Sequence, residues 1–69
     1  MNIQKDFGLK LKKFRKEAGL SQEKLALLAD IDRTYVHSIE KGDRNISIGI
    51  IQKLAQALEI EIADFFING

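Results

Sequence analysis

Residues 22–40 of the chain read QEKLALLADIDRTYVHSIE, and this stretch decides the fold. Its apolar spacing predicts two short helices, one over residues 21–29 and one over residues 33–41. Asp30 occupies the tight turn between them, and Gly42 is suited to end the second helix in the left-handed conformation. The two helices are therefore joined with almost no loop.

The packing of these two helices depends on small and apolar side chains. Ala26 lets the second helix cross close above the first, and Val36 and Ile39 fix the second helix to the core. The side chains expected to point inward from the first helix are Leu25, Leu28 and Ala29. Together these features meet the requirements of a helix-turn-helix over about residues 21–41.

The outward face of the second helix is polar. It carries Arg33, Thr34, His37, Ser38 and Lys41. Hydrogen-bond donors and acceptors on a rigid helix fit the major groove of duplex DNA. An arginine in the first helical turn is able to bind guanine O6 and N7 with two parallel hydrogen bonds, and the alternative for Arg33 is a solvated surface side chain.

The rest of the chain predicts three further helices and no strand. Phe7, Leu11, Phe14 and Ala18 form an apolar stripe along a helix over about residues 5–18. Ser47 is a good cap for a helix over about residues 48–58, and a short last helix covers about residues 61–67. The inner face of the helix over 48–58 carries Ile51, Leu54, Ala55 and Leu58. We expect one compact all-α domain of five helices over residues 1–69.

Composition excludes several kinds of site. The chain has no cysteine and one histidine, His37, so we expect no metal site and no cofactor. Residues 1–16 lack the apolar segment of a signal peptide, and no apolar run approaches the ~20 residues that span a bilayer. We therefore expect a cytoplasmic protein with no membrane partner.

Charge is distributed unevenly along the chain although the net charge is only +1. Residues 1–16 carry six basic side chains against Asp6 alone, whereas residues 54–69 carry three acidic side chains and no basic one. A polyanion is therefore attracted to the first end of the chain and repelled by the second.

Several short motifs support a family resemblance. Residues 20–22, 25–26 and 39–42 match the pattern of the Cro/C1-type (XRE) repressors, and the resemblance covers about Phe7 to Phe66. Residues 32–36 with 42–47 are more particularly similar to the controller proteins of restriction-modification systems. This resemblance implies a five-helix, lambda-repressor-like domain. It also implies a transcriptional regulator that binds double-stranded DNA as a homodimer on two half-sites, with RNA polymerase as a further partner if it activates.

The outward face and the resemblance together assign roles to residues. The expected base contacts are Arg33, Thr34, Tyr35, His37 and Ser38, with packing at the rim of the core as the alternative for Tyr35. The expected DNA backbone contacts are Gln22, Lys41, Arg44, Asn45 and Ser47, and Ser47 is first of all a helix cap. The resemblance also pairs Glu40 with Arg15 as a structural ion pair. One departure is Asp30, where the family usually has glycine.

Apolar residues are left over at the C-terminal end. Ile50, Ile60, Ile62, Phe65 and Phe66 lie outside the core stripe, and we expect them to form the interface of a symmetric homodimer. No nucleophile–base pair and no glycine-rich phosphate loop is present, so an enzyme is not expected. The alternatives are another Cro/C1-type repressor, an antitoxin that binds a protein as well as DNA, and a protein–protein adaptor.

Overall fold

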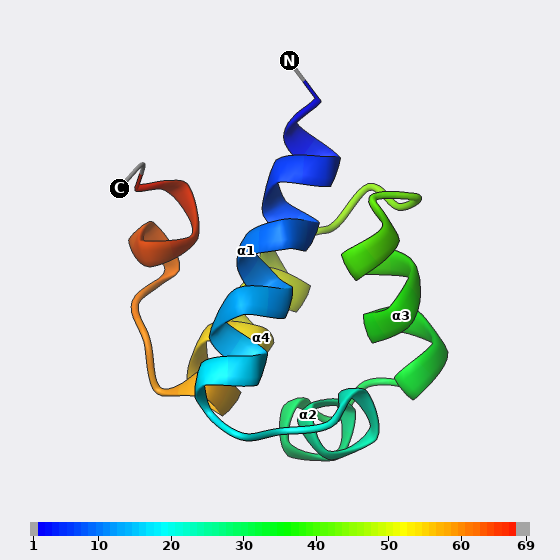
Figure 1. The fold of residues 1–69 in the computed structure, drawn as a ribbon, viewed down its shortest axis with the longest axis vertical. Coiled ribbons are helices and arrows are strands. Elements are labelled where there is room, and N and C mark those ends of the chain that lie inside the picture. The colour runs from blue at the N-terminus through cyan, green and yellow to red at the C-terminus, as the bar shows by residue number, and fades with distance from the viewer. Residues whose placement is uncertain (1, 68–69) are drawn as a thin grey trace.

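The computed structural model describes residues 2–67, which form four α-helices followed by one 3-10 helix (Figure 1). The elements are α1 (Ile3–Glu17), α2 (Gln22–Ala29), α3 (Arg33–Lys41), α4 (Ile48–Leu58) and η1 (Ile62–Phe66). The described residues contain no strand, which confirms the all-α class. The expectation of five α-helices is wrong at the last element. Its five residues are too few for a stable α-helix, and 3-10 geometry is typical of such short pieces.

The helices begin where side-chain caps are available. Ser21 Oγ accepts from the N–H of Lys24 at 3.0 Å, and Ser47 Oγ accepts from the N–H of Ile50 at 3.2 Å, as expected of N-caps. Asn2 caps α1 through Lys5, which is why this helix begins two residues before the predicted start.

Left-handed residues end α2, α3 and α4. Asp30 has φ 58° and ends α2, and Gly42 has φ 79° and ends α3, as the sequence predicts. Glu59 ends α4 with φ 58°, a position that the sequence does not single out. At each of these residues the chain therefore turns sharply away from the direction of the helix that it ends.

The helix α1 passes through the middle of the fold. In Figure 1, α3 lies on one side of α1 and the C-terminal segment with η1 lies on the other. The helices α1 and α3 meet closely at Gly8, where an added Cβ would lie 2.4 Å from the carbonyl oxygen of Ile39. The helix α2 packs against both α3 and α4. The polar face of α3 is thereby left on the outside, away from η1.

The core is assembled from every element. Its largest fully buried side chains are Leu11, Leu25, Val36, Ile39 and Leu54. Ala26 is also buried, as the crossing of α2 and α3 requires. Phe65 of η1 is buried as well, with its ring centroid 4.7 Å from that of Phe7.

Two expectations about the core are corrected. Leu28 is 51% exposed because the inner face of α2 is formed by Leu25, Ala26 and Ala29, which turns Leu28 toward solvent. Ala18 is exposed because α1 ends at Glu17, so the apolar stripe stops at the half-buried Phe14.

Among the described helices, none combines the length and apolar character that a bilayer crossing requires.

Candidate nucleic-acid interface

The polar face of α3 borders an open cleft of about 570 Å³. From α3 the cleft is lined by Arg33, Thr34, His37 and Ser38, and from the start of α2 by Ser21, Gln22 and Glu23. The structure therefore brings four of the five predicted base-contact residues together with Gln22. Ser38 is half-buried, whereas the other three are exposed.

Arg33 is held by Glu23, an acidic neighbour that spacing along the chain does not reveal. Its Nη1 lies 3.0 Å from Oε2 of Glu23, one of the first residues of α2. Both side chains are largely exposed, so this ion pair contributes little to stability. The guanidinium is thus kept beside the cleft and is easily released to another acceptor.

Thr34 takes part in the cap of α3. Its backbone N–H and its hydroxyl both donate to Oδ1 of Asp32 at 2.8 Å. These two hydrogen bonds, with the nearby Arg33, lower the pKa of the Asp32 carboxyl from its ordinary value of 3.8. The hydroxyl proton is therefore committed to the cap, and the methyl group is left for outward contact.

Tyr35 lies between the core and the loop that follows α3. Its side chain is half-buried and packs against the core, and the guanidinium carbon of Arg44 lies 4.7 Å from the ring centroid. This is a cation–π contact, which holds Arg44 of the loop against α3. The tyrosine ring therefore belongs to the rim of the core and at the same time orients a basic side chain.

The other residues predicted to contact the DNA backbone lie at the end of α3 and in the loop before α4. Lys41 Nζ lies 3.6 Å from Oδ2 of Asp43, and the Asn45 side chain accepts from the Gln4 amide. Ser47 caps α4, and its hydroxyl oxygen is used in that cap. Lys41 and the loop residues do not line the cleft. Two polar clusters therefore flank α3, one at the start of α2 beside the cleft and one in the loop before α4.

A largely buried network forms part of the cleft wall, which Arg15 and Gln22 both line. Arg15 Nε lies 2.6 Å from Oε2 of Glu40, and Arg15 Nη2 donates to Oε1 at 3.1 Å. Gln22 Nε2 donates to the same Oε1 at 3.0 Å, and Arg15 Nη1 donates to the carbonyl oxygen of Leu20. The structure thus brings Arg15 and Glu40 together, and it adds Gln22 to the pair.

The apolar residues expected at the dimer interface divide into three groups by their burial. Phe65 is only 3% exposed, so the prediction that it lies at an interface is wrong; its ring fills the chain's own core. Ile50 and Ile60 are half-buried against the core. Ile62 and Phe66 remain exposed, at 38% and 50%.

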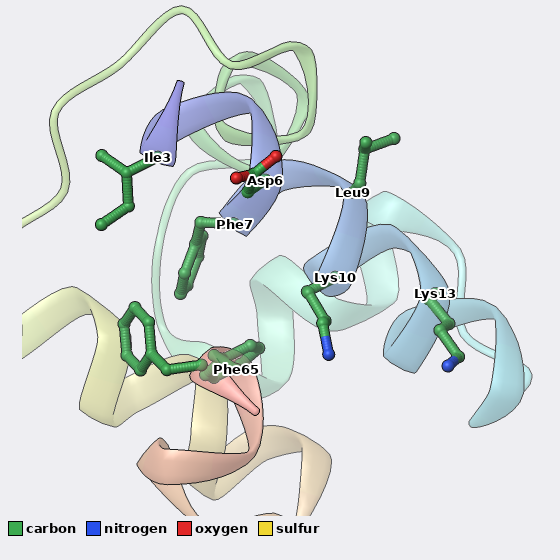
Figure 2. Close-up of a pocket in the computed structure, with 8 residues that line it drawn as sticks. Ile3, Asp6, Phe7, Leu9, Lys10, Lys13 and Phe65 are labelled. Carbon is green, nitrogen blue, oxygen red and sulfur yellow. The ribbon is translucent and has the colours of Figure 1, made fainter. Parts of the chain in front are cut away.

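A second apolar surface appears beside η1. Figure 2 shows the groove between α1 and η1, with the ring of Phe7 turned toward Phe65 and with Lys10 and Lys13 on the same stretch of α1. Ile3, at the start of α1, also lines it and is 66% exposed. In Figure 1, η1 and α3 lie on opposite sides of α1, so a groove lined by α1 and η1 is on the side away from α3.

Comparison with models of known protein families shows which family the chain belongs to. The model of the helix-turn-helix family HTH_3 matches residues 11–65. The chain belongs to this family. Since the matched range includes α2, α3 and α4, the membership rests on the elements that form the candidate interface.

Individual relatives show which kind of helix-turn-helix protein the chain resembles. Control protein C.MunI of Mycoplasma sp is 49% identical over 61 residues, which cover 87% of this chain and 82% of the relative. Control protein C.BamHI of Bacillus amyloliquefaciens is 42% identical over 64 residues, which cover 91% and 79%. The crystal structure of the restriction-modification controller protein C.AhdI from Aeromonas hydrophila matches with a TM-score of 0.90 at 48% identity, covering 91% of this chain and 96% of that one.

These findings confirm the resemblance to Cro/C1-type regulators and to controller proteins. The chain is a helix-turn-helix DNA-binding regulator of the controller-protein type, and its family consists of transcription regulators rather than enzymes.

Proposed function

We propose that this protein is a restriction-modification controller that binds double-stranded DNA as a symmetric homodimer on two half-sites. The observation that carries the proposal is the exposed polar face of α3, flanked on one side by Gln22 and on the other by the loop at residues 43–47. A helix that presents donors and acceptors between two backbone-binding clusters has the geometry needed to enter the major groove.

In this arrangement α3 reads base edges. Arg33 leaves Glu23 and donates to guanine, and Thr34 presents its methyl group to thymine. The remaining base contacts are His37, Ser38 and Tyr35, whose ring packs on the rim of the core and is only half-buried, so that part of it stays open to DNA. The DNA backbone is held by Gln22, Lys41, Arg44, Asn45 and Ser47. The Tyr35–Arg44 stack keeps Arg44 at the edge of the recognition helix.

The homodimer forms through α4 and η1. Ile62 and Phe66 contribute exposed apolar side chains, and Ile50 and Ile60 contribute half-buried ones. Three acidic side chains and no basic one in residues 54–69 keep this end away from DNA. Two-fold pairing then places the two copies of α3 about one DNA turn apart, ~34 Å. Contact with RNA polymerase follows only if the bound dimer activates a promoter.

Duplex binding is tested by selecting a site from random duplexes and titrating it at different salt concentrations. With about 8 phosphate contacts per dimer, affinity falls roughly 10³–10⁵-fold between 50 and 200 mM salt. Two protected half-sites one turn apart are the expected footprint. Absence of any salt-dependent duplex binding contradicts the proposal and favours a protein–protein adaptor.

Sedimentation tests the dimer separately. Phe66→Glu places a charge in the proposed interface, so it yields monomer at concentrations where the natural chain is dimeric. Leu28→Glu is a matched control, because Leu28 on α2 is 51% exposed, like Phe66 at 50%, but lies outside the interface. Only monomer for the natural chain at micromolar concentration contradicts the dimer.

A further inference from the structure

The Gln22 side chain is fixed in the free protein by a buried carboxylate on another helix. Its Nε2 donates to Oε1 of Glu40 at 3.0 Å, across the join between the start of α2 and the end of α3. The Glu40 side chain is only 5% exposed. Since a carboxylate accepts and does not donate, it selects the orientation of the amide, with nitrogen inward and one N–H of that nitrogen left over.

Arg15 makes this use of Glu40 possible. Its guanidinium donates to both carboxylate oxygens, and its own side chain is 10% exposed. An unpaired carboxylate beside the cleft would repel a DNA phosphate, whereas the paired one has its charge balanced within hydrogen-bond distance. The pair thus offers Gln22 an acceptor without adding net charge to the surface.

We propose that the Arg15–Glu40 pair is a positioning device for DNA binding, which orients the Gln22 amide toward a backbone phosphate before DNA arrives. The inference rests on the proposed function, because it assigns a purpose to Gln22 within that interface. Glu40 and Arg15 are positioning residues, and Gln22 is the group that touches DNA. A long side chain that is already ordered loses less freedom on binding, which is worth about 3- to 10-fold in affinity.

The first test needs no substitution. Three glutamine side-chain amides are compared by ¹⁵N relaxation in the free protein: Gln22, and the exposed Gln52 and Gln56 of α4 as internal references. We expect the Gln22 amide to be as ordered as the backbone of α2 and to stay so when DNA binds. A Gln22 amide as mobile as those of Gln52 and Gln56 overturns the proposal.

The second test is a double-mutant cycle on duplex affinity. Gln22→Ala weakens binding about 3- to 10-fold. Glu40→Gln has a similar effect, because the amide oxygen stays on Arg15 Nε at the position of Oε2 and the NH2 group takes the position of Oε1, where it is a donor and no longer accepts from Gln22 Nε2. Combining the two weakens binding no further than Gln22→Ala alone, within about 2-fold. If Glu40→Gln costs the same factor with and without Gln22, the pair is merely structural and the proposal fails.

Two comparisons keep the outcome clear. Glu17→Gln makes the same charge change at an exposed position of α1 and leaves affinity unaltered. Unchanged affinity for Gln22→Ala, in a protein whose binding still depends on Arg33, refutes this inference and leaves the proposed function intact. If the natural chain does not bind duplex DNA at all, the proposed function itself is refuted.

Discussion

Arg15 Nε lies 2.6 Å from Oε2 of Glu40, and this contact joins α1 to the end of α3 with both side chains at most 10% exposed. A glutamate near a helix C-terminus is unfavourable by itself, because the helix dipole places negative charge there. The guanidinium compensates for it in the buried site. The pair therefore ties the recognition helix to the centre of the fold.

Removing one partner is expected to be costly. Glu40→Ala leaves the Arg15 charge buried without its partner and lowers the free energy of unfolding by about 3–5 kcal/mol. A domain of this size has only several kcal/mol in total, so thermal unfolding followed by circular dichroism should show a largely unfolded variant near room temperature. Replacing both residues, Arg15→Met with Glu40→Leu, should recover much of the loss. A Glu40→Ala variant as stable as the natural chain would contradict the buried pair.

The close approach of α1 and α3 at Gly8 gives a second prediction. An added Cβ would lie 2.4 Å from the carbonyl oxygen of Ile39 and 2.8 Å from that of Glu40, both backbone atoms. Gly8→Ala therefore forces the helices apart and destabilises the protein by about 1–3 kcal/mol, although alanine is the better helix former. Gly49→Ala is the control, since a Cβ there meets only Ser47 Oγ at 3.8 Å and the change should be neutral or stabilising. Urea titrations measure the free energy of unfolding of both variants. An equal increase for Gly8→Ala and Gly49→Ala would refute the tight crossing of α1 and α3.

The left-handed residues that end α2 and α4 predict two stabilising changes. Asp30 and Glu59 both have φ 58°, where side chains with a Cβ are strained. Asp30→Gly and Glu59→Gly should each be neutral or raise the free energy of unfolding by up to ~1 kcal/mol. Melting temperatures provide the measurement. A clear drop for Asp30→Gly would indicate that this turn does not need a left-handed residue.

The cap of α3 predicts a dependence on acid. The hydrogen bonds from Thr34 lower the pKa of Asp32 in the folded protein below its unfolded value of 3.8. The stabilisation is therefore complete above the unfolded pKa and is lost as pH falls through the folded pKa. Asp32→Asn keeps a side-chain cap that does not titrate, so its melting temperature should fall less than that of the natural chain between about pH 5 and pH 2.5. Parallel curves would show that the cap does not depend on the carboxylate.

Local signals in the sequence were sufficient for most of the fold. The bounds of α3 and α4 follow from the caps Asp32 and Ser47, and the left-handed turn follows from Asp30. Leu28 and Phe65 depart from the sequence prediction for a common reason. The direction in which a side chain points depends on how neighbouring helices cross, and spacing along the chain does not determine that crossing.

The site was predictable as a face but not as a network. Helical spacing places Arg33 and His37 together on α3, whatever the rest of the fold. The pairing of Arg33 with Glu23 and the contact of Gln22 with Glu40 join residues 10 and 18 positions apart. Such contacts are fixed by tertiary packing, so only the structure reveals them.

The recognition helix is tested most directly by replacing its outward side chains together. Arg33, Thr34 and Ser38 lie outside the core, so the triple alanine variant should keep the helical spectrum and the cooperative melt of the natural chain. Each good pair of hydrogen bonds to a base is worth about 1–3 kcal/mol, so duplex affinity should fall at least about 100-fold and the sequence preference should disappear. A folded triple variant with unchanged affinity and unchanged preference would contradict the central claim that α3 reads the DNA.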